Sequence, residues 1–104
     1  MAFTVTSERN GDDAILRLTG ELDAAASTDL RTAITASADP APTRLLFYVG
    51  DLTYMASAGL RTLVFARQHM GEHVEIILIG IQPAVRETLE LTGFQHSVTL
   101  VDSI

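Results

Sequence analysis

The fold is decided by residues 44–70, which read RLLFYVGDLTYMASAGLRTLVFARQHM. Residues 44–49 form an apolar run of the kind found in strands that are buried on both faces, which is typical of parallel sheets. After a loop that starts at Gly50, apolar residues recur at helical spacing from Ser57 to about Met70. The stretch therefore predicts a buried strand, a loop and an amphipathic helix, which together form part of a layered α/β domain.

Two strands and a helix are predicted before this stretch. Residues 3–7 and 14–20 carry strand patterns and are separated by turn-forming residues. Asp23 stands directly before three alanines, where its side chain would make a good N-cap for a helix that runs to about Ala36. We expect Leu22, Leu30 and Ile34 to form the buried stripe of that helix.

The part of the chain after residue 70 predicts two more strands and one more helix. Residues 74–79 read as a buried strand, and Pro83 suits the first turn of a helix that Gly93 and Phe94 would cap. Residues 97–101 read as a short last strand. The whole chain, residues 1–104, is thus predicted to be one α/β domain with three helices and a mostly parallel mixed sheet of about five strands.

Composition excludes several classes of function. The net charge of −6 disfavours electrostatic binding to nucleic acid or to an anionic membrane, so neither is expected as a partner. The chain contains no cysteine, which removes disulfides and thiolate chemistry. Because neither a signal peptide nor a membrane-spanning run is recognisable, we expect a soluble protein of the cytoplasm.

Ser57 is the most informative candidate site residue. It stands directly before the helical pattern, where serine is a favoured N-cap, and a purely structural capping role is one interpretation. The other is functional: a helix N-terminus tolerates a phosphate group, and the small neighbours Ala56, Ala58 and Gly59 would leave the hydroxyl open to a kinase.

Enzymatic and metal-binding alternatives are weaker. A serine nucleophile in a tight elbow needs a glycine where this chain has Met55, and no acid is recognisably placed to orient a histidine. His69 and His73 have the spacing of a metal pair, but Gly71 lies between them where the helix should end. No catalytic residue, metal site or cofactor is therefore predicted.

A partner surface is predicted on the helix that follows Ser57. Arg61, Phe65 and Gln68 project away from the apolar stripe, and an exposed aromatic beside an arginine is typical of a partner anchor. Alternatively, Phe65 packs beneath a neighbouring helix. Glu21 and Asp23 could likewise contribute to docking or form a solvated acidic face.

Three segments resemble the STAS domain of bacterial anti-sigma factor antagonists. They are Ser57-Ala58-Gly59-Leu60-Arg61, residues 18–23 (LTGELD) and residues 85–94 (VRETLELTGF), in the order that the family shows. The resemblance implies a regulator that is not an enzyme. Unphosphorylated, such a protein binds an anti-sigma factor that is also a serine kinase; phosphorylation of the serine that Ser57 matches breaks the complex, and a phosphatase restores it.

The resemblance also implies a docking surface and two departures from the family. The expected docking residues are Glu21, Asp23, Tyr54, Ala56, Ser57, Ala58, Gly59, Arg61, Phe65 and Gln68. Ala56 and Tyr48 stand where members often carry acids, and the family's C-terminal fourth helix is short or absent here. We expect a monomer or weak homodimer. The alternative function is a STAS scaffold subunit of a transporter or signalling assembly, without phosphorylation.

Overall fold

The protein, described by a computed structural model over residues 2–104, contains one five-stranded sheet in the order β1-β2-β3-β4-β5. β1 pairs with β2 in antiparallel fashion, and the remaining neighbours are parallel. This confirms the predicted mixed, mostly parallel sheet with three helices. The elements are β1 (Thr4–Asn10), β2 (Asp13–Leu22), α1 (Ala24–Ser37), β3 (Arg44–Met55), α2 (Ser57–Met70), β4 (Glu75–Ile79), α3 (Pro83–Glu90), the 3-10 helix η1 (Phe94–Ser97) and β5 (Thr99–Val101).

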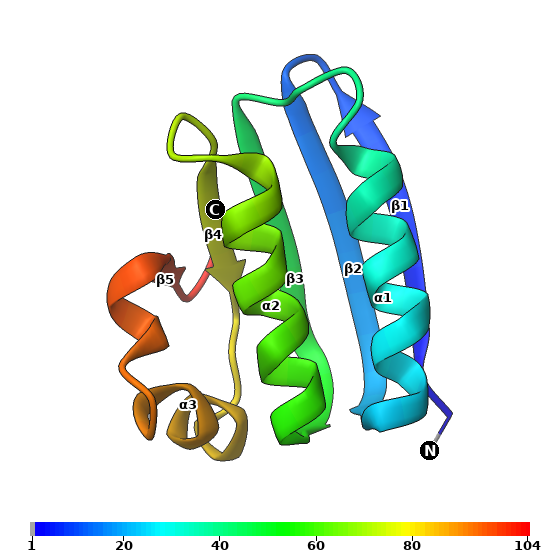
Figure 1. Ribbon diagram of the computed structural model, residues 1–104. Helices are drawn as coiled ribbons and strands as arrows, with labels where there is room; N and C mark the ends of the chain where they lie inside the picture. The colour runs from blue at the N-terminus through cyan, green and yellow to red at the C-terminus, as the bar shows by residue number, and fades with distance from the viewer. Residues whose placement is uncertain (1) are drawn as a thin grey trace.

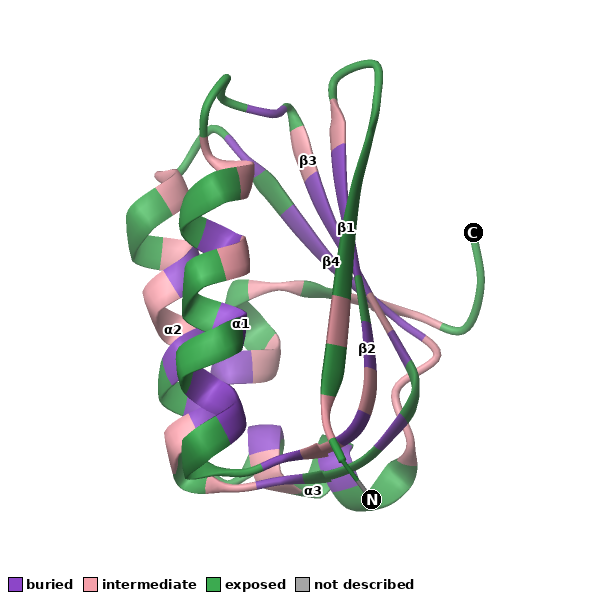
Figure 2. Cartoon of the chain, turned by 90° about the vertical axis from the view of Figure 1, so that its right-hand side faces the viewer, coloured by how far each residue is buried: buried purple, intermediate pink, exposed green. Residues whose placement is uncertain are grey.

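The helices α1 and α2 lie side by side on one face of the sheet (Figure 1). Figure 2 views the sheet from its β1 edge, with both helices on the same side and α3 at the end of the molecule where α1 and α2 begin. Parallel strands need crossover connections, and α1 and α2 supply the first two of them. Both helices consequently start at the same end of the sheet, where the parallel strands that precede them finish.

The main core fills the space between the sheet and these helices. It is built on side chains that are fully buried, because α1 and α2 each direct an apolar stripe at the sheet. Leu22, Leu30 and Ile34 are all buried as predicted, although Leu22 is the last residue of β2 and not part of α1. The largest fully buried members from the sheet are Phe47 and the leucines Leu16, Leu18, Leu22, Leu45, Leu52 and Leu78.

The opposite face of the sheet carries no helix within the described residues (Figure 2). Four aliphatic side chains on this face are nevertheless buried: Ile15, Leu46, Ile77 and Ile79. Tyr48 packs against them, and the guanidinium of Arg17 lies 4.3 Å from the centre of its ring. Long polar side chains can cover an apolar surface with their stems, so this face is shielded without a second helical layer.

The strand β3 differs from the prediction. We expected a strand that ends at Val49 and a loop from Gly50, but β3 continues to Met55. Its second half pairs with the end of β2 through two register irregularities, and Glu21 faces Tyr54. This long-range pairing supplies hydrogen bonds that a local pattern containing Gly50, Asp51 and Thr53 does not reveal.

The segment after α3 also differs. The residue that caps α3 is Leu91, whereas Gly93, with a φ of 75°, is the N-cap of the unpredicted helix η1. Phe94 is buried, so its expected apolar contact with the core is present. The last strand starts at Thr99, two residues later than predicted, and no further helix follows it within the described chain.

Candidate functional site

Ser57 is the first residue of α2 and is exposed. The predicted N-cap role is wrong: the N-cap is Ala56, with an extended backbone (φ −77°, ψ 166°) and no side-chain capping bond. The helix starts at Ser57 itself, one residue earlier than a cap at this position would require. Among the described residues, none forms a hydrogen bond with the Ser57 hydroxyl, which is therefore free to react or to contact a partner.

The start of α2 lies beside the start of α1. Leu22 faces Met55 at the paired ends of β2 and β3, and the Ala56 N–H donates to the Leu22 carbonyl over 2.9 Å. Asp23 caps α1 as predicted, since its Oδ1 accepts from the Ala26 N–H at 2.8 Å. The positive ends of two helix dipoles therefore meet near Ser57, where they favour an added negative charge.

The neighbours of Ser57 differ in exposure. Tyr54 is 49% exposed and is one of the three large apolar side chains that the described chain leaves exposed. Asp23 is exposed, whereas Glu21 is half-buried and engaged with other residues. Ala56 and Ala58 are half-buried, and Gly59 is buried against Leu22. Most residues of this predicted set are thus accessible to a partner, whereas Gly59 lies beneath the surface.

Phe65 does not stand free on the surface of α2. Its ring is half-buried against the main core, and the guanidinium carbon of Arg31 on α1 lies 3.9 Å from the ring centre. His69 stacks on the same ring, with 5.0 Å between the ring centres. Of the two interpretations, the structure supports packing against the neighbouring helix. Arg61 and Gln68 are exposed.

The contacts of Arg31 and His69 with Phe65 were not predicted from the sequence. The spacing of four residues between Phe65 and His69 places them on neighbouring helical turns and could have indicated their contact. Nothing local identifies Arg31, because its contact depends on how α1 packs beside α2. Arg31 and His69 thus cover Phe65 on the outside of the two helices.

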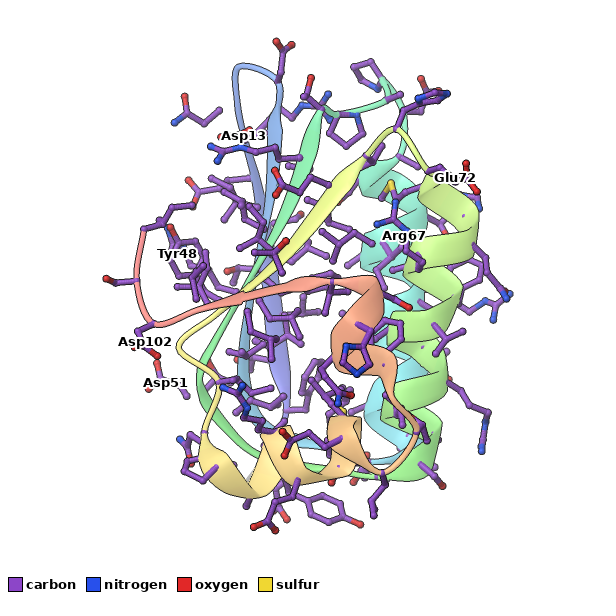
Figure 3. All side chains as sticks on the ribbon, turned by 90° about the vertical axis from the view of Figure 1, so that its left-hand side faces the viewer. Asp13, Tyr48, Asp51, Arg67, Glu72 and Asp102 are labelled. Atoms are coloured by element: carbon purple, nitrogen blue, oxygen red, sulfur yellow. The ribbon has the colours of Figure 1, made fainter. Side chains whose placement is uncertain are left out.

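The far end of α2 confirms the predicted helix stop. The helix ends at Met70, and Gly71 follows with a φ of 84°. Arg67 donates to the carbonyls of Gly71 and Val74, which ties the helix end to the start of β4 (Figure 3). His69 therefore lies on the helix and His73 beyond it. Within residues 2–104, no three metal-binding side chains cluster at a possible metal site.

An ion pair joins the first residues of β2 and β3, at the opposite end of the sheet from Ser57. Arg44 donates two hydrogen bonds to Asp13, of 2.9 and 2.7 Å. These bonds, and to a smaller extent the positive charge, hold the pKa of the Asp13 carboxyl below its ordinary value; desolvation opposes them. The pair stabilises strand pairing and has no direct part in the Ser57 site.

The position of Tyr48 requires a correction. The resemblance places Tyr48 where members often carry an acid, but Tyr48 lies near the middle of β3 and faces the side of the sheet without helices (Figure 3). The acid in β3 is Asp51, which is exposed and lies nearer to Ser57 in the chain than Tyr48 does. The absence of an acid at Tyr48 therefore says nothing about the surroundings of Ser57.

Comparison with known proteins identifies the family. The sequence profile of the STAS domain matches residues 4–104. The chain belongs to the STAS domain family. This STAS domain is 35% identical over 78 residues to a Bordetella bronchiseptica protein named "Putative anti-sigma factor antagonist BtrV", covering 74% of this chain and 67% of that protein. It is 30% identical to a STAS-domain containing protein of Pseudomonas aeruginosa, over 92% of this chain and 95% of the relative.

A solved structure confirms the fold of the STAS domain. The crystal structure of an anti-sigma factor antagonist from Mycobacterium paratuberculosis superposes with a TM-score of 0.90 at 22% identity, covering 99% of this chain and 88% of the other. In residues 2–104, no helix is both long enough and apolar enough to cross a membrane.

Proposed function

We propose that this STAS domain is an anti-sigma factor antagonist whose binding to an anti-sigma factor is controlled by phosphorylation of Ser57. The name of the Bordetella relative supports the type of partner. The observation that carries the proposal is the exposed, unbonded Ser57 hydroxyl at the start of α2, directly beside the start of α1. A hydroxyl in this place can be reached by a kinase and can be read by a docked partner.

The electrostatics explain how one phosphate could act as a switch. Phosphorylation adds a charge of about −1.5 to −2 and three acceptor oxygens, which the adjoining helix N-termini tolerate. The domain would therefore stay folded in both states. In a docked complex the same charge must be desolvated against the partner, which is costly unless a cation pairs with it. Phosphorylation thus weakens binding without unfolding either protein.

In this proposal the chain is a substrate and not an enzyme. The anti-sigma factor is also a serine kinase: the Ser57 oxygen takes the γ-phosphoryl group of ATP, ADP leaves, and the hydroxyl proton passes to a base of the kinase. A phosphatase returns the domain to its binding form. We place this cycle in the cytoplasm, with the domain, residues 1–104, acting as a monomer or weak homodimer without a cofactor.

The test is phosphorylation by the anti-sigma factor kinase of the source organism that binds the chain. Incubation with ATP and mass spectrometry should place one phosphate on Ser57. The Ser57→Ala variant should remain unmodified, whereas Ser97→Ala, which removes another exposed serine, should be phosphorylated like the wild type. A kinase that binds the chain and leaves Ser57 unmodified would contradict the switch.

Ala56 favours a second candidate function, because many family members carry an acid directly before the serine. A STAS domain without a phosphorylation cycle could serve as a scaffold subunit of a transporter or signalling assembly. Affinity purification distinguishes the two: a membrane transporter recovered in place of an anti-sigma factor would support the scaffold.

A further inference from the structure

Gly59 occupies a helical position that its backbone does not explain. It is the third residue of α2 and has no positive φ, so any residue could adopt its conformation. Glycine is also among the least favourable residues in a helix. The reason for glycine must therefore lie in the space around it.

That space is filled by Leu22. A Cβ atom added to Gly59 would lie 2.7 Å from Leu22 Cγ, 2.9 Å from Leu22 Cδ2 and 3.0 Å from the Leu22 carbonyl oxygen. The two distances to Leu22 carbons are shorter than Cβ contacts in folded proteins, the approach to the oxygen is tight, and Leu22 is fully buried in a closely packed core. Only glycine lets α2 approach the end of β2 this closely.

Leu22 also holds the residue on the other side of Ser57. Its carbonyl accepts the Ala56 N–H at 2.9 Å, so Ala56 and Gly59 are both anchored on one buried residue. Leu22 is followed directly by Asp23, the cap of α1. One residue thus joins the start of α1 to the two backbone positions that enclose Ser57 and Ala58.

We infer that Leu22 and Gly59 are positioning residues, which hold Ser57 at a defined place beside the start of α1. The inference rests on the proposed function for its consequence, because a displaced Ser57 would meet its kinase in the wrong place. A Cβ at Gly59 would force α2 away from β2 by a shift on the order of 1 Å, and errors of that size in a reacting group can reduce a rate severely.

The experiment compares four proteins: wild type, Gly59→Ala, Leu22→Ala/Gly59→Ala and the control Ile34→Ala. Ile34 is equally buried but lies about three turns along α1 from its start, so its loss destabilises the core far from Ser57. The first measurement is amide hydrogen exchange at Ala56 by NMR, which needs no partner. The second is the rate of Ser57 phosphorylation by the kinase that modifies the wild type.

We expect Gly59→Ala to speed Ala56 exchange and to slow phosphorylation by about tenfold or more. The double variant removes the side-chain atoms that the new Cβ would meet, and should recover part of both losses. Ile34→Ala should lower thermal stability but phosphorylate within about twofold of wild type. If Gly59→Ala fails to fold, the double variant is compared with Ile34→Ala instead. A double variant that folds and is phosphorylated on Ser57 then shows the recovery.

Several results would overturn the inference. They are unchanged Ala56 exchange and phosphorylation in Gly59→Ala, an equal loss of phosphorylation in Ile34→Ala, or a double variant no better than Gly59→Ala. A wild-type chain that no anti-sigma factor kinase modifies would instead contradict the proposed function. In that case Ala56 exchange alone would decide whether Leu22 and Gly59 hold this turn.

Discussion

The two helices that cover the sheet start side by side but in different ways. Both follow the end of a parallel strand, yet α1 is capped by Asp23, whose carboxylate accepts the Ala26 N–H. The helix α2 follows Ala56 and has no side-chain cap, while its serine stands one position too late to provide one. The backbone N–H groups of a first helical turn need partners, and α2 begins without the side-chain acceptor that α1 has.

The difference between the two helix starts is one of stability as well as of exposure. A capping side chain is typically worth about 1 kcal/mol, and α2 forgoes it at the place where its hydroxyl is exposed. Departures from local stability rules tend to coincide with functional sites. In the proposed function, the start of α1 contributes rigidity and the start of α2 contributes recognition.

A negative charge should have its largest effect at the start of α2. We expect Ser57→Asp to weaken binding of the anti-sigma factor by about thirtyfold, because an unpaired charge buried at an interface costs about 2 kcal/mol or more. Ser57→Ala should bind within about threefold of wild type. Ala24→Asp places the same charge on the first residue of α1 and should weaken binding less. Titration calorimetry measures all three, and equal affinities for Ser57→Asp and Ser57→Ala would oppose the account.

Removing the cap of α1 should have the next largest effect, on stability. Asp23→Ala leaves the Ala26 N–H without its acceptor and should lower the free energy of unfolding by about 1 kcal/mol. Urea denaturation measures the loss. The control Asp29→Ala removes an exposed acid of the same helix and should stay within about 0.5 kcal/mol of wild type. Equal losses in the two variants would show that Asp23 does not act as a cap.

Adding a cap to α2 should produce a smaller change of opposite sign. Ala56→Ser supplies a side-chain oxygen at the N-cap and should raise the free energy of unfolding by about 0.5 kcal/mol, since serine is favoured there over alanine. The same urea experiment provides the value. A loss of stability would mean that the first turn of α2 already has its partners.

The ion pair at the opposite end of the sheet should have the smallest effect. Arg44 lowers the pKa of Asp13 in the folded protein, so the pair stabilises the fold above the unfolded-state pKa. This contribution disappears as the pH falls through the lowered folded-state pKa. Asp13→Asn should therefore lower the melting temperature slightly at pH 7, with a gap to wild type that closes in strong acid. Partner affinity should not change; a gap that persists at low pH would contradict the cited direction.

Most of the fold could be predicted because its signals are local. Apolar periodicity gave the bounds of α2, and an acid before three alanines gave the start of α1. The second half of β3 was missed because its hydrogen bonds come from β2, more than thirty residues earlier in the chain. Ser57 was predicted to be a cap because it stands directly before the apolar periodicity, but the helix already includes it.

The candidate site was predictable as a set of residues but not in its geometry. Serine, small neighbours and the start of a helix are visible in sequence, and their resemblance to the STAS domain indicated their role. The contact between Leu22 and Gly59, and the position of Arg31 over Phe65, depend on how two helices pack on one sheet. Such contacts follow from tertiary structure and leave no local pattern.

The most direct test compares the natural protein in its two chemical states. Wild-type protein carrying one phosphate on Ser57 and unmodified wild-type protein are each titrated into the same anti-sigma factor by calorimetry, with circular dichroism to establish that both are folded. The account predicts tight binding for the unmodified form and binding at least about a hundredfold weaker for the phosphorylated form, equivalent to about 3 kcal/mol. Equal affinities of two folded forms would contradict it.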